Sequence, residues 1–356
     1  MANFVEKESI FLRIAKYPIP WKGDKPVEII RKIIFLAAAV VLVVSLVTII
    51  SFYGSDAQDR KFNQQISDIY HGSATVTVDQ TKQEELAEEY PEVNEKFLPL
   101  LEQNKDVIGW ITMGDPDDPF IDNVVVQGDD NAYYLDHNLN GDYSKTGTVF
   151  ADYREKITPQ NTPANTILYG HNVVTGEYFA KLTRYFNYRY GKDNGLDWYR
   201  KYPTITFNTL YHDKTYKIFA GMLVNTQEED GEVFYYLQGR KFKTKAEFDD
   251  YIAQILDRTT FFTDVDLQYG DNLITLSTCI LDYTVDCRWV IFGREVREGE
   301  DPTVDVDKAY ENPDPLYFDY YYRVYGGSWG GRKWDPAMIF DYSYSTGSAE
   351  ADKSDE

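Results

Sequence analysis

The longest apolar stretch of the chain runs from residue 33 to residue 53 and contains 21 residues without a charge. A helix of that length covers the hydrocarbon core of a bilayer, so the pattern predicts one transmembrane helix at 33–53. A cleaved signal peptide is the alternative. The stretch is long for a signal peptide, begins only at residue 33 and is followed by no convincing small-residue cleavage site.

The charges on the two sides of this stretch predict its orientation. Residues 1–32 contain seven basic and four acidic side chains, although the whole chain has a formal net charge of -22. The positive-inside rule therefore places residues 1–32 in the cytoplasm and the remainder outside the cell membrane. The same acidic excess argues against a nucleic-acid partner, because phosphate binding requires a basic surface.

After the apolar stretch, short apolar runs alternate with turn residues. Residues 54–84 are polar without a sustained period, which predicts a stalk or frayed helix, and 83–103 favours two short amphipathic helices. Eight later runs have the length and composition of strands, which predicts a mostly β domain with a closed or nearly closed barrel. These runs are 107–113, 123–127, 147–151, 166–170, 204–207, 216–224, 273–278 and 289–296.

Two segments between the strand-like runs have a helical pattern. The first is 178–185. The second is 245–258, in which Phe248, Ile252 and Ile255 share one helical face. The second helix therefore interrupts the strand series just before the run at 273–278.

The end of the chain, residues 299–356, differs in composition from the rest. From residue 301 onward it holds 12 acidic and 5 basic residues, four prolines and eight tyrosines. Such a mixture buries little core of its own, which favours a disordered or loosely docked extension. The alternative is a tyrosine-rich segment that packs on the domain or on the cell wall.

The chain has two cysteines, Cys279 and Cys287, which are too few for a disulfide-rich scaffold, and no Cys/His cluster has zinc-ligand spacing. Strand alternation places Cys279 on one face with Thr275 and Ser277, at the point where a strand opens into a loop. Taken alone, a cysteine in this position is more often a small buried hydrophobe than a nucleophile.

Two further residues make Cys279 a candidate nucleophile. His171 follows the run at 166–170 and precedes a polar loop, a position from which an imidazole can face a cleft. Arg288 leads into an apolar run, where a charged side chain requires either a functional role or an ion pair with a carboxylate. Asp286 is the candidate for such a structural ion pair. Cysteine catalysis requires a thiol, an imidazole and an oxyanion donor. The remaining histidines are expected at the surface: His71, His137 and His212.

In this order the motifs resemble those of class B sortases. The strand ending Thr275-Leu276-Ser277-Thr278-Cys279 is followed by Arg288, and Tyr169-Gly170-His171-Asn172 lies upstream. The resemblance covers about residues 85–298, and its departures are the acidic tyrosine-rich tail and Cys287, which we expect to pack on the strand face opposite Arg288. The further matching segments are 104–111, 124–127, 131–135, 147–150 with Asp152, and the helix at 245–258.

The resemblance implies a mostly β, eight-stranded sortase barrel with N-terminal helices and a helix inserted before the cysteine strand, preceded by one transmembrane helix. It also implies a transpeptidase that cuts a C-terminal sorting signal of an exported surface protein. Carried over to this chain, Cys279 is the nucleophile, His171 exchanges protons and Arg288 stabilises the oxyanion. Thr278 and Ser277 contact the substrate. The resemblance implies no cofactor and no metal.

The sequence leaves the acceptor open. A peptidoglycan amine is the first expectation, and a pilin lysine, as in pilus-assembly sortases, is the alternative with the same catalytic residues. A catalytically silent surface-binding module on a sortase-like barrel is the alternative from another class, and simple proteolysis is a related one. The scarcity of cysteine suggests a Gram-positive surface. Substrate specificity is expected to depend on the loops around 227–245 and on the inserted helix at 245–258.

Overall fold

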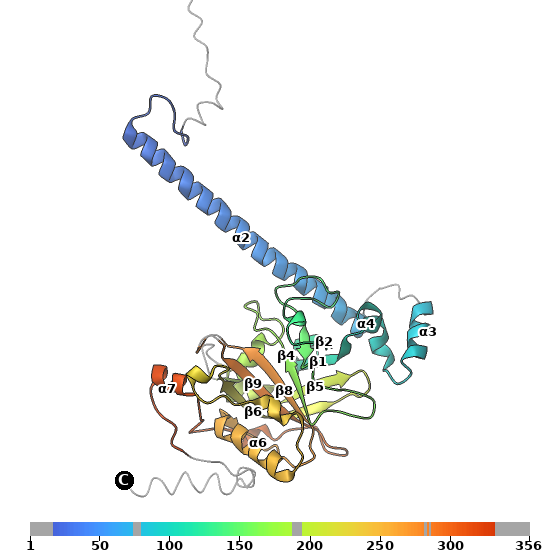
Figure 1. The fold of residues 1–356 in the computed structure, drawn as a ribbon. Coiled ribbons are helices and arrows are strands. Elements are labelled where there is room, and N and C mark those ends of the chain that lie inside the picture. Colours follow the sequence, from blue (N-terminus) through green and yellow to red (C-terminus); the bar gives the residue numbers. More distant parts are fainter. Residues whose placement is uncertain (1–16, 74–79, 187–193, 281–282, 285, 332–356) are drawn as a thin grey trace, which may run out of the picture. The chain divides into compact units, whose positions relative to one another are not determined.

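The computed structural model describes residues 17–73, 80–186, 194–280, 283–284 and 286–331, and in this part of the chain eight strands close into a barrel (Figure 1). The strand order around the barrel is β1-β2-β3-β4-β8-β9-β6-β5, which confirms the predicted eight-stranded barrel. The barrel strands are β1 (Val107–Asp115), β2 (Asp118–Val126), β3 (Val149–Ala151), β4 (Asn165–Tyr169), β5 (Thr204–Thr209), β6 (Thr215–Val224), β8 (Leu273–Cys279) and β9 (Arg288–Glu295). A separate two-stranded sheet pairs β7 (Phe261–Phe262) with β10 (Tyr310–Glu311).

The described residues also form helices before, between and after the barrel strands in the sequence. The α-helices are α2 (Pro26–Tyr70), α3 (Gln80–Glu89), α4 (Leu98–Gln103), α5 (Leu196–Lys201), α6 (Lys245–Arg258) and α7 (Asp319–Tyr325). The 3₁₀ helices are η1 (Glu95–Phe97), η2 (Tyr133–Leu135), η3 (Ala180–Tyr185), η4 (Glu228–Asp230), η5 (Tyr236–Arg240) and η6 (Val306–Lys308). The helical segments expected at 83–103, 178–185 and 245–258 are thus present, the second of them as a 3₁₀ helix.

The inserted helix α6 forms for reasons that are visible in its sequence. Thr244 caps its N-terminus, since the Thr244 hydroxyl accepts a hydrogen bond from the Glu247 amide. The apolar face Phe248, Ile252 and Ile255 is buried in a cluster with residues of β6 and β9. α6 therefore covers the outside of the barrel beside β6 (Figure 1).

Two strand pairs of the barrel are parallel, and the other pairs are antiparallel. β4 runs parallel to β8, with Tyr169 opposite Ser277, and β8 runs antiparallel to β9, with Cys279 opposite Arg288. β2 and β3 form the other parallel pair. The C-terminal ends of β4 and β8 and the start of β9 therefore meet at one edge of the barrel.

The N-terminal helix α2 is longer than the sequence pattern suggests. Its part from Pro26 to Ile50 is long and apolar enough to cross a membrane. The helix then continues through most of the segment expected to be a stalk. Near its end Ile66 and Tyr70 are buried, and the Tyr70 ring stacks on Trp110 of β1 at a centroid distance of 4.2 Å. Packing against the barrel thus begins before the expected domain limit at residue 85, because the last turns of α2 carry an apolar face.

The first part of the C-terminal extension packs on the domain. β10 pairs with β7, and Ala309, Asn312 and Phe318 are buried. For the described residues 299–331 the structure therefore corresponds to the alternative of a segment docked on the domain, rather than to disorder. Residues 332–356 of the expected extension lie outside the described residues.

Candidate active site

Cys279 and Arg288 face each other at the edge of the barrel. They are directly paired across the antiparallel strands β8 and β9, and the Nη1 atom of Arg288 donates to the Sγ atom of Cys279. Both side chains are partly exposed. The alternative ion pair with Asp286 is not formed, because the Asp286 carboxylate accepts from Gln227 Nε2 at 3.0 Å instead. A guanidinium in this position can also donate hydrogen bonds to an oxygen beside the sulfur.

The parallel pairing of β4 with β8 brings His171 to the same edge. His171 lies two residues beyond Tyr169, and Cys279 lies two residues beyond Ser277, which is the partner of Tyr169. The two strands stay connected past their ends, because Asn172 Nδ2 donates to the Cys279 carbonyl at 2.9 Å. His171 therefore follows the end of β4, Cys279 ends β8 and Arg288 begins β9, and these three strands are neighbours in the barrel.

Local packing fixes the position of His171. A Cβ atom on Gly170 would lie 2.6 Å from the Phe179 ring, so only glycine allows that ring to pack against this backbone. The Phe179 amide donates to the His171 carbonyl at 3.1 Å. The imidazole Nε2 lies 2.7 Å from the Leu135 carbonyl and must carry the proton to donate there. In the neutral ring, Nδ1 is then the nitrogen that can accept a proton.

Thr278 and Ser277 differ in their surroundings, although the sequence predicted a substrate-binding role for both. Thr278 is buried on the strand face opposite Cys279, and its hydroxyl donates to the Gly170 carbonyl at 2.8 Å. Ser277 shares the face of Cys279, where its hydroxyl lies 3.1 Å from the Tyr236 hydroxyl. In this structure Thr278 therefore links β8 to the His171 segment, and Ser277 contacts η5.

Tyr236 is a site residue that sequence reasoning did not single out. It opens η5 and lies close enough to Arg288 and Cys279 for their charges to affect its pKa, which burial raises above its ordinary value. The segment around 227–245 was expected to determine specificity, but nothing in the local pattern distinguishes Tyr236 from the other tyrosines. Its role becomes visible only from the contact with Ser277.

The second cysteine has a different environment from Cys279. Cys287 is fully buried in the main core cluster, and burial raises the pKa of its thiol to about 12. A thiol that stays protonated at physiological pH is a poor nucleophile. The expectation that Cys287 packs on the face opposite Arg288 is consistent with this burial.

Two buried carboxyl groups follow β3, and their pKa values move in opposite directions. Burial raises the pKa of Asp152, but hydrogen bonds from Arg154 and Asn131 outweigh it and bring the pKa down to about 2. Asp152 also accepts from the Tyr169 hydroxyl at 3.0 Å, which connects it to the end of β4. Glu155 has no comparable partner, and burial together with the Asp152 charge raises its pKa to about 8.

The other three histidines have partners of their own. His71 contacts Asp122, and His212 Nε2 lies 2.9 Å from the Pro159 carbonyl. His137 stacks on Tyr133 at a centroid distance of 4.2 Å. Within the residues that the structure describes, no group of three or more His, Cys, Asp or Glu side chains could hold a metal ion. The site thus combines a thiol, an imidazole and a guanidinium, an arrangement suited to nucleophilic acyl transfer.

Known proteins with similar sequences are sortases. Sortase B of Listeria monocytogenes is 31% identical over 252 residues, which cover 69% of this chain and 90% of the relative. Sortase B of Staphylococcus aureus is 26% identical over 187 residues, covering 52% of this chain and 68% of the relative. No protein-family model matches the chain.

Solved structures show the same relationship. Sortase B from Bacillus anthracis in complex with AAEK1 superposes with a TM-score of 0.53 at 25% identity, over 69% of this chain and 99% of that one. The Staphylococcus aureus sortase B–substrate complex gives a TM-score of 0.52 at 23% identity, over 68% of this chain and 98% of that one, and this likeness shows the fold. With the barrel, the thiol site and the match to nearly the whole Listeria protein, the chain belongs to the class B sortase family.

Proposed function

We propose that this chain is a membrane-anchored cysteine transpeptidase that cleaves a C-terminal sorting signal of an exported surface protein and transfers the acyl group to a peptidoglycan amine. Membership of the sortase B family implies a transpeptidase. The observation that supports the chemistry most directly is the contact between the Arg288 guanidinium and the Cys279 sulfur, at the edge of the barrel that also carries His171.

In the first half-reaction the Cys279 thiolate attacks the scissile carbonyl carbon, and a C–S bond forms. The carbonyl oxygen takes up negative charge, which Arg288 stabilises with a donor that remains charged. The tetrahedral intermediate then collapses as the C–N bond breaks. A protonated His171 gives its proton to the leaving amine, and the acyl group remains on Cys279 as a thioester.

In the second half-reaction an acceptor amine attacks the thioester carbonyl. The neutral His171 removes a proton from this amine, Arg288 again stabilises the oxyanion, and the C–S bond breaks to release the thiolate. A new amide bond replaces the one that was cleaved. Protons and bonds balance over the cycle with the side chains of this chain alone.

The proposed location follows from the N-terminal part of the chain. The apolar part of α2 would anchor the protein in the cell membrane, with residues 1–32 in the cytoplasm and the barrel outside. A transpeptidase in that position meets exported proteins as they leave the membrane and meets wall precursors at the membrane surface. Both reactants of the proposed reaction are therefore within its reach.

Product analysis tests this proposal and distinguishes its alternatives. We would incubate the full chain in detergent with a library of sorting-signal peptides, with no amine, with triglycine or with a lysine-bearing pilin peptide. Peptidoglycan transfer predicts rapid formation of the triglycine amide. Preferential use of the pilin lysine would favour pilus assembly, amine-independent hydrolysis would favour proteolysis, and no turnover by the folded protein would favour a binding module.

A further inference from the structure

The C-terminal extension contains a segment that is anchored firmly to the barrel. We call residues 309–325 the C-terminal brace. Besides the pairing of β10 with β7, Asn312 Nδ2 donates to the Thr259 carbonyl at 2.7 Å, and the Leu316 amide donates to the Asp257 carbonyl at 2.7 Å. These contacts fix the brace to the end of α6 and to the chain that follows it.

Beyond these anchors the brace reaches the loop that joins Cys279 to Arg288. Tyr283 in this loop packs against two residues of α7, with ring centroids 5.5 Å from Tyr321 and 5.4 Å from Tyr325. Phe318 of the brace is buried in the same core cluster as Tyr283 and Cys287. Phe318 thus extends the core cluster that contains Cys287, the residue just before β9.

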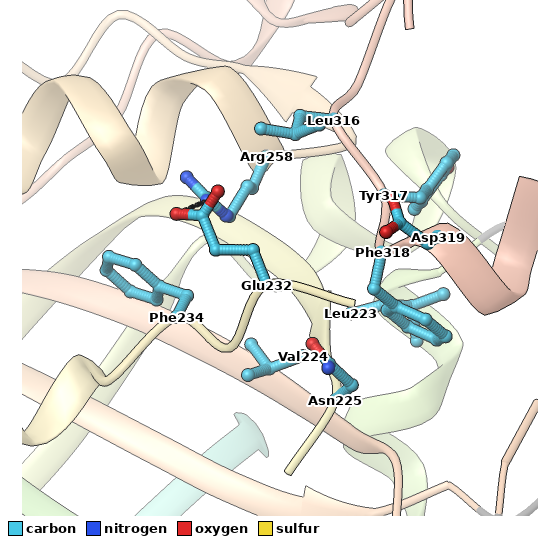
Figure 2. A pocket seen from close by; sticks show the side chains of 10 residues that line it. All are labelled: Leu223, Val224, Asn225, Glu232, Phe234, Arg258, Leu316, Tyr317, Phe318 and Asp319. Carbon is cyan, nitrogen blue, oxygen red and sulfur yellow. Dashed lines mark hydrogen bonds and ion pairs between the residues drawn. The ribbon is translucent and has the colours of Figure 1, made fainter. Parts of the chain in front are cut away.

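The brace also contacts the segment that follows β6. A Cβ atom on Gly231 would lie 2.6 Å from the Asp319 amide nitrogen, which shows how closely the two backbones approach. Figure 2 shows the small cavity beside this contact, whose lining includes Leu223 and Glu232 together with Leu316 and Phe318 of the brace. Its volume is only about 70 Å³. The brace and the segment after β6 therefore line one small cavity and are in contact beside it.

The two segments contacted by the brace are tied to each other. The Thr284 hydroxyl donates to the Asp230 carboxylate at 2.5 Å, and Gln227 Nε2 donates to the Asp286 carboxylate at 3.0 Å. The Thr226 hydroxyl donates to the Asp286 carbonyl at 3.0 Å. The segment after β6 therefore bonds to Asp286, just before Arg288, and the brace packs against that same segment.

We infer that the C-terminal brace positions Arg288 for its contact with Cys279. The inference rests on the proposed transpeptidase function, in which Arg288 stabilises the oxyanion. Tyr321 and Phe318 are positioning residues, which act on Arg288 through Tyr283 and through the core cluster that contains Cys287. The purely structural alternative is that the brace only stabilises the barrel, in which case its loss would not act through Arg288.

The test uses the full chain with Tyr321→Ala, with Tyr321→Phe as the rescue variant that keeps the ring. Val324→Ala is the matched control, because Val324 lies on the same helix and is 52% exposed. We expect kcat for Tyr321→Ala to fall about tenfold with KM nearly unchanged, because a small displacement of an oxyanion donor lowers the rate without removing substrate contacts. Tyr321→Phe and Val324→Ala should keep the wild-type kcat.

A double-mutant cycle separates positioning from stabilisation. In an Arg288→Ala background we expect Tyr321→Ala to cause little further loss of kcat, since the group that it positions is already absent. An equal loss in both backgrounds, or no loss in the wild-type background, would overturn the inference. Tyr325→Ala removes the other α7 ring that contacts Tyr283 and should show the same non-additivity if Tyr321→Ala folds poorly.

Hydrogen exchange gives a readout that does not depend on activity. Amides of 286–290 should exchange faster in Tyr321→Ala than in Val324→Ala, while those of β1 and β2 keep their protection. Unchanged exchange at 286–290 would contradict the inference even if turnover were altered. If the wild-type chain turned over no peptide, the proposed function would fail, and the exchange result would still decide whether the brace holds the start of β9.

Discussion

The contact between Arg288 and Cys279 is the single-residue feature on which the proposed chemistry depends most. A cysteine at the end of a strand is ambiguous in sequence, and so is an arginine at the start of another. In the structure the two residues are directly paired across β8 and β9, and the Arg288 guanidinium donates to the Cys279 sulfur. The proposed mechanism adds His171 as the group that transfers protons.

Replacing Arg288 tests the oxyanion role at this scale. We expect Arg288→Ala to lower kcat/KM by about 10²-fold or more, which is the usual effect of losing one oxyanion donor. Arg288→Lys should restore only part of the activity, since the ammonium group keeps the charge but lacks the planar arrangement of several N–H donors. Steady-state kinetics with a peptide substrate measure both effects, with circular dichroism as the check on folding. Near-normal rates in a folded Arg288→Ala protein would refute the role.

Glu155 makes the stability of the barrel depend on pH. Burial raises its pKa in the folded protein to about 8 from an ordinary value of 4.5. Between these values the folded state holds a proton that the unfolded state has lost, so stability should fall as the pH rises from 4.5 to 8. Glu155→Gln should remove this dependence and stabilise the protein above pH 8 by a few kcal/mol, on the order of magnitude that such a shift implies.

Urea unfolding at pH 5, 7 and 9 measures this effect. The control is Asp117→Asn, which changes an exposed carboxylate and should leave the pH dependence of the wild type in place. If Glu155→Gln and the wild type had parallel stability profiles across this range, the carboxyl group would not be protonated in the folded state.

Individual site residues differed in how far the sequence could predict them. The pattern and the resemblance both singled out Cys279, His171 and Arg288. Each lies at or just beyond the end of a strand, where a reactive or charged side chain has few structural roles. Strand alternation already places Thr278 on the face opposite Cys279, and only the resemblance implied that it contacts the substrate. Tyr236 depends on a contact over 41 residues of chain, which the local sequence does not encode.

Among the elements, β4 matters most for the site, because its parallel pairing with β8 carries His171 to the level of Cys279. The strands were predictable since each is a short apolar run between turn residues. Their order around the barrel was not, because the pairing of β4 with β8 joins segments more than 100 residues apart. The length of α2 was also underestimated: Ile66 and Tyr70 form an apolar face too sparse to stand out among polar neighbours.

Gly170→Ala tests the packing that holds the end of β4. The new methyl group would collide with the Phe179 ring and push away the segment that carries His171. We expect at least about a tenfold loss of kcat, because proton transfer requires close alignment, and about 1–3 kcal/mol of destabilisation from overpacking. Gly54→Ala, where the same Cβ atom meets open space, is the matched control. Equal activity in the two variants would show that His171 tolerates displacement.

For the whole molecule, the N-terminal charge pattern predicts orientation in the membrane. Protease added to intact protoplasts should digest the barrel and leave a protected fragment containing residues 1–32 and the apolar part of α2. Detection with tags at the two ends of the chain measures this, and permeabilised cells provide the control in which the N-terminal tag is also lost. Protection of the barrel in intact protoplasts would reverse the proposed topology.

The C-terminal extension shows the limit of composition as a guide at this scale. Its acidic, tyrosine-rich sequence favours disorder when considered alone, because it cannot form a core by itself. In the described residues it instead contributes Ala309 and Phe318 to the core of the barrel domain and adds a strand to β7. Docking of a polar segment thus depends on the surface that the rest of the chain offers, and the composition of the segment alone does not predict it.

The central claim is that Cys279 carries the acyl group during transfer. Mass spectrometry of the full chain in detergent, quenched with acid during reaction with a sorting-signal peptide, tests this claim most directly. The account predicts an adduct with the mass of the N-terminal peptide fragment on Cys279, absent in Cys279→Ala and discharged by an added amine into a new amide. Turnover of the peptide with no adduct on Cys279, or with equal rates in Cys279→Ala, would contradict it.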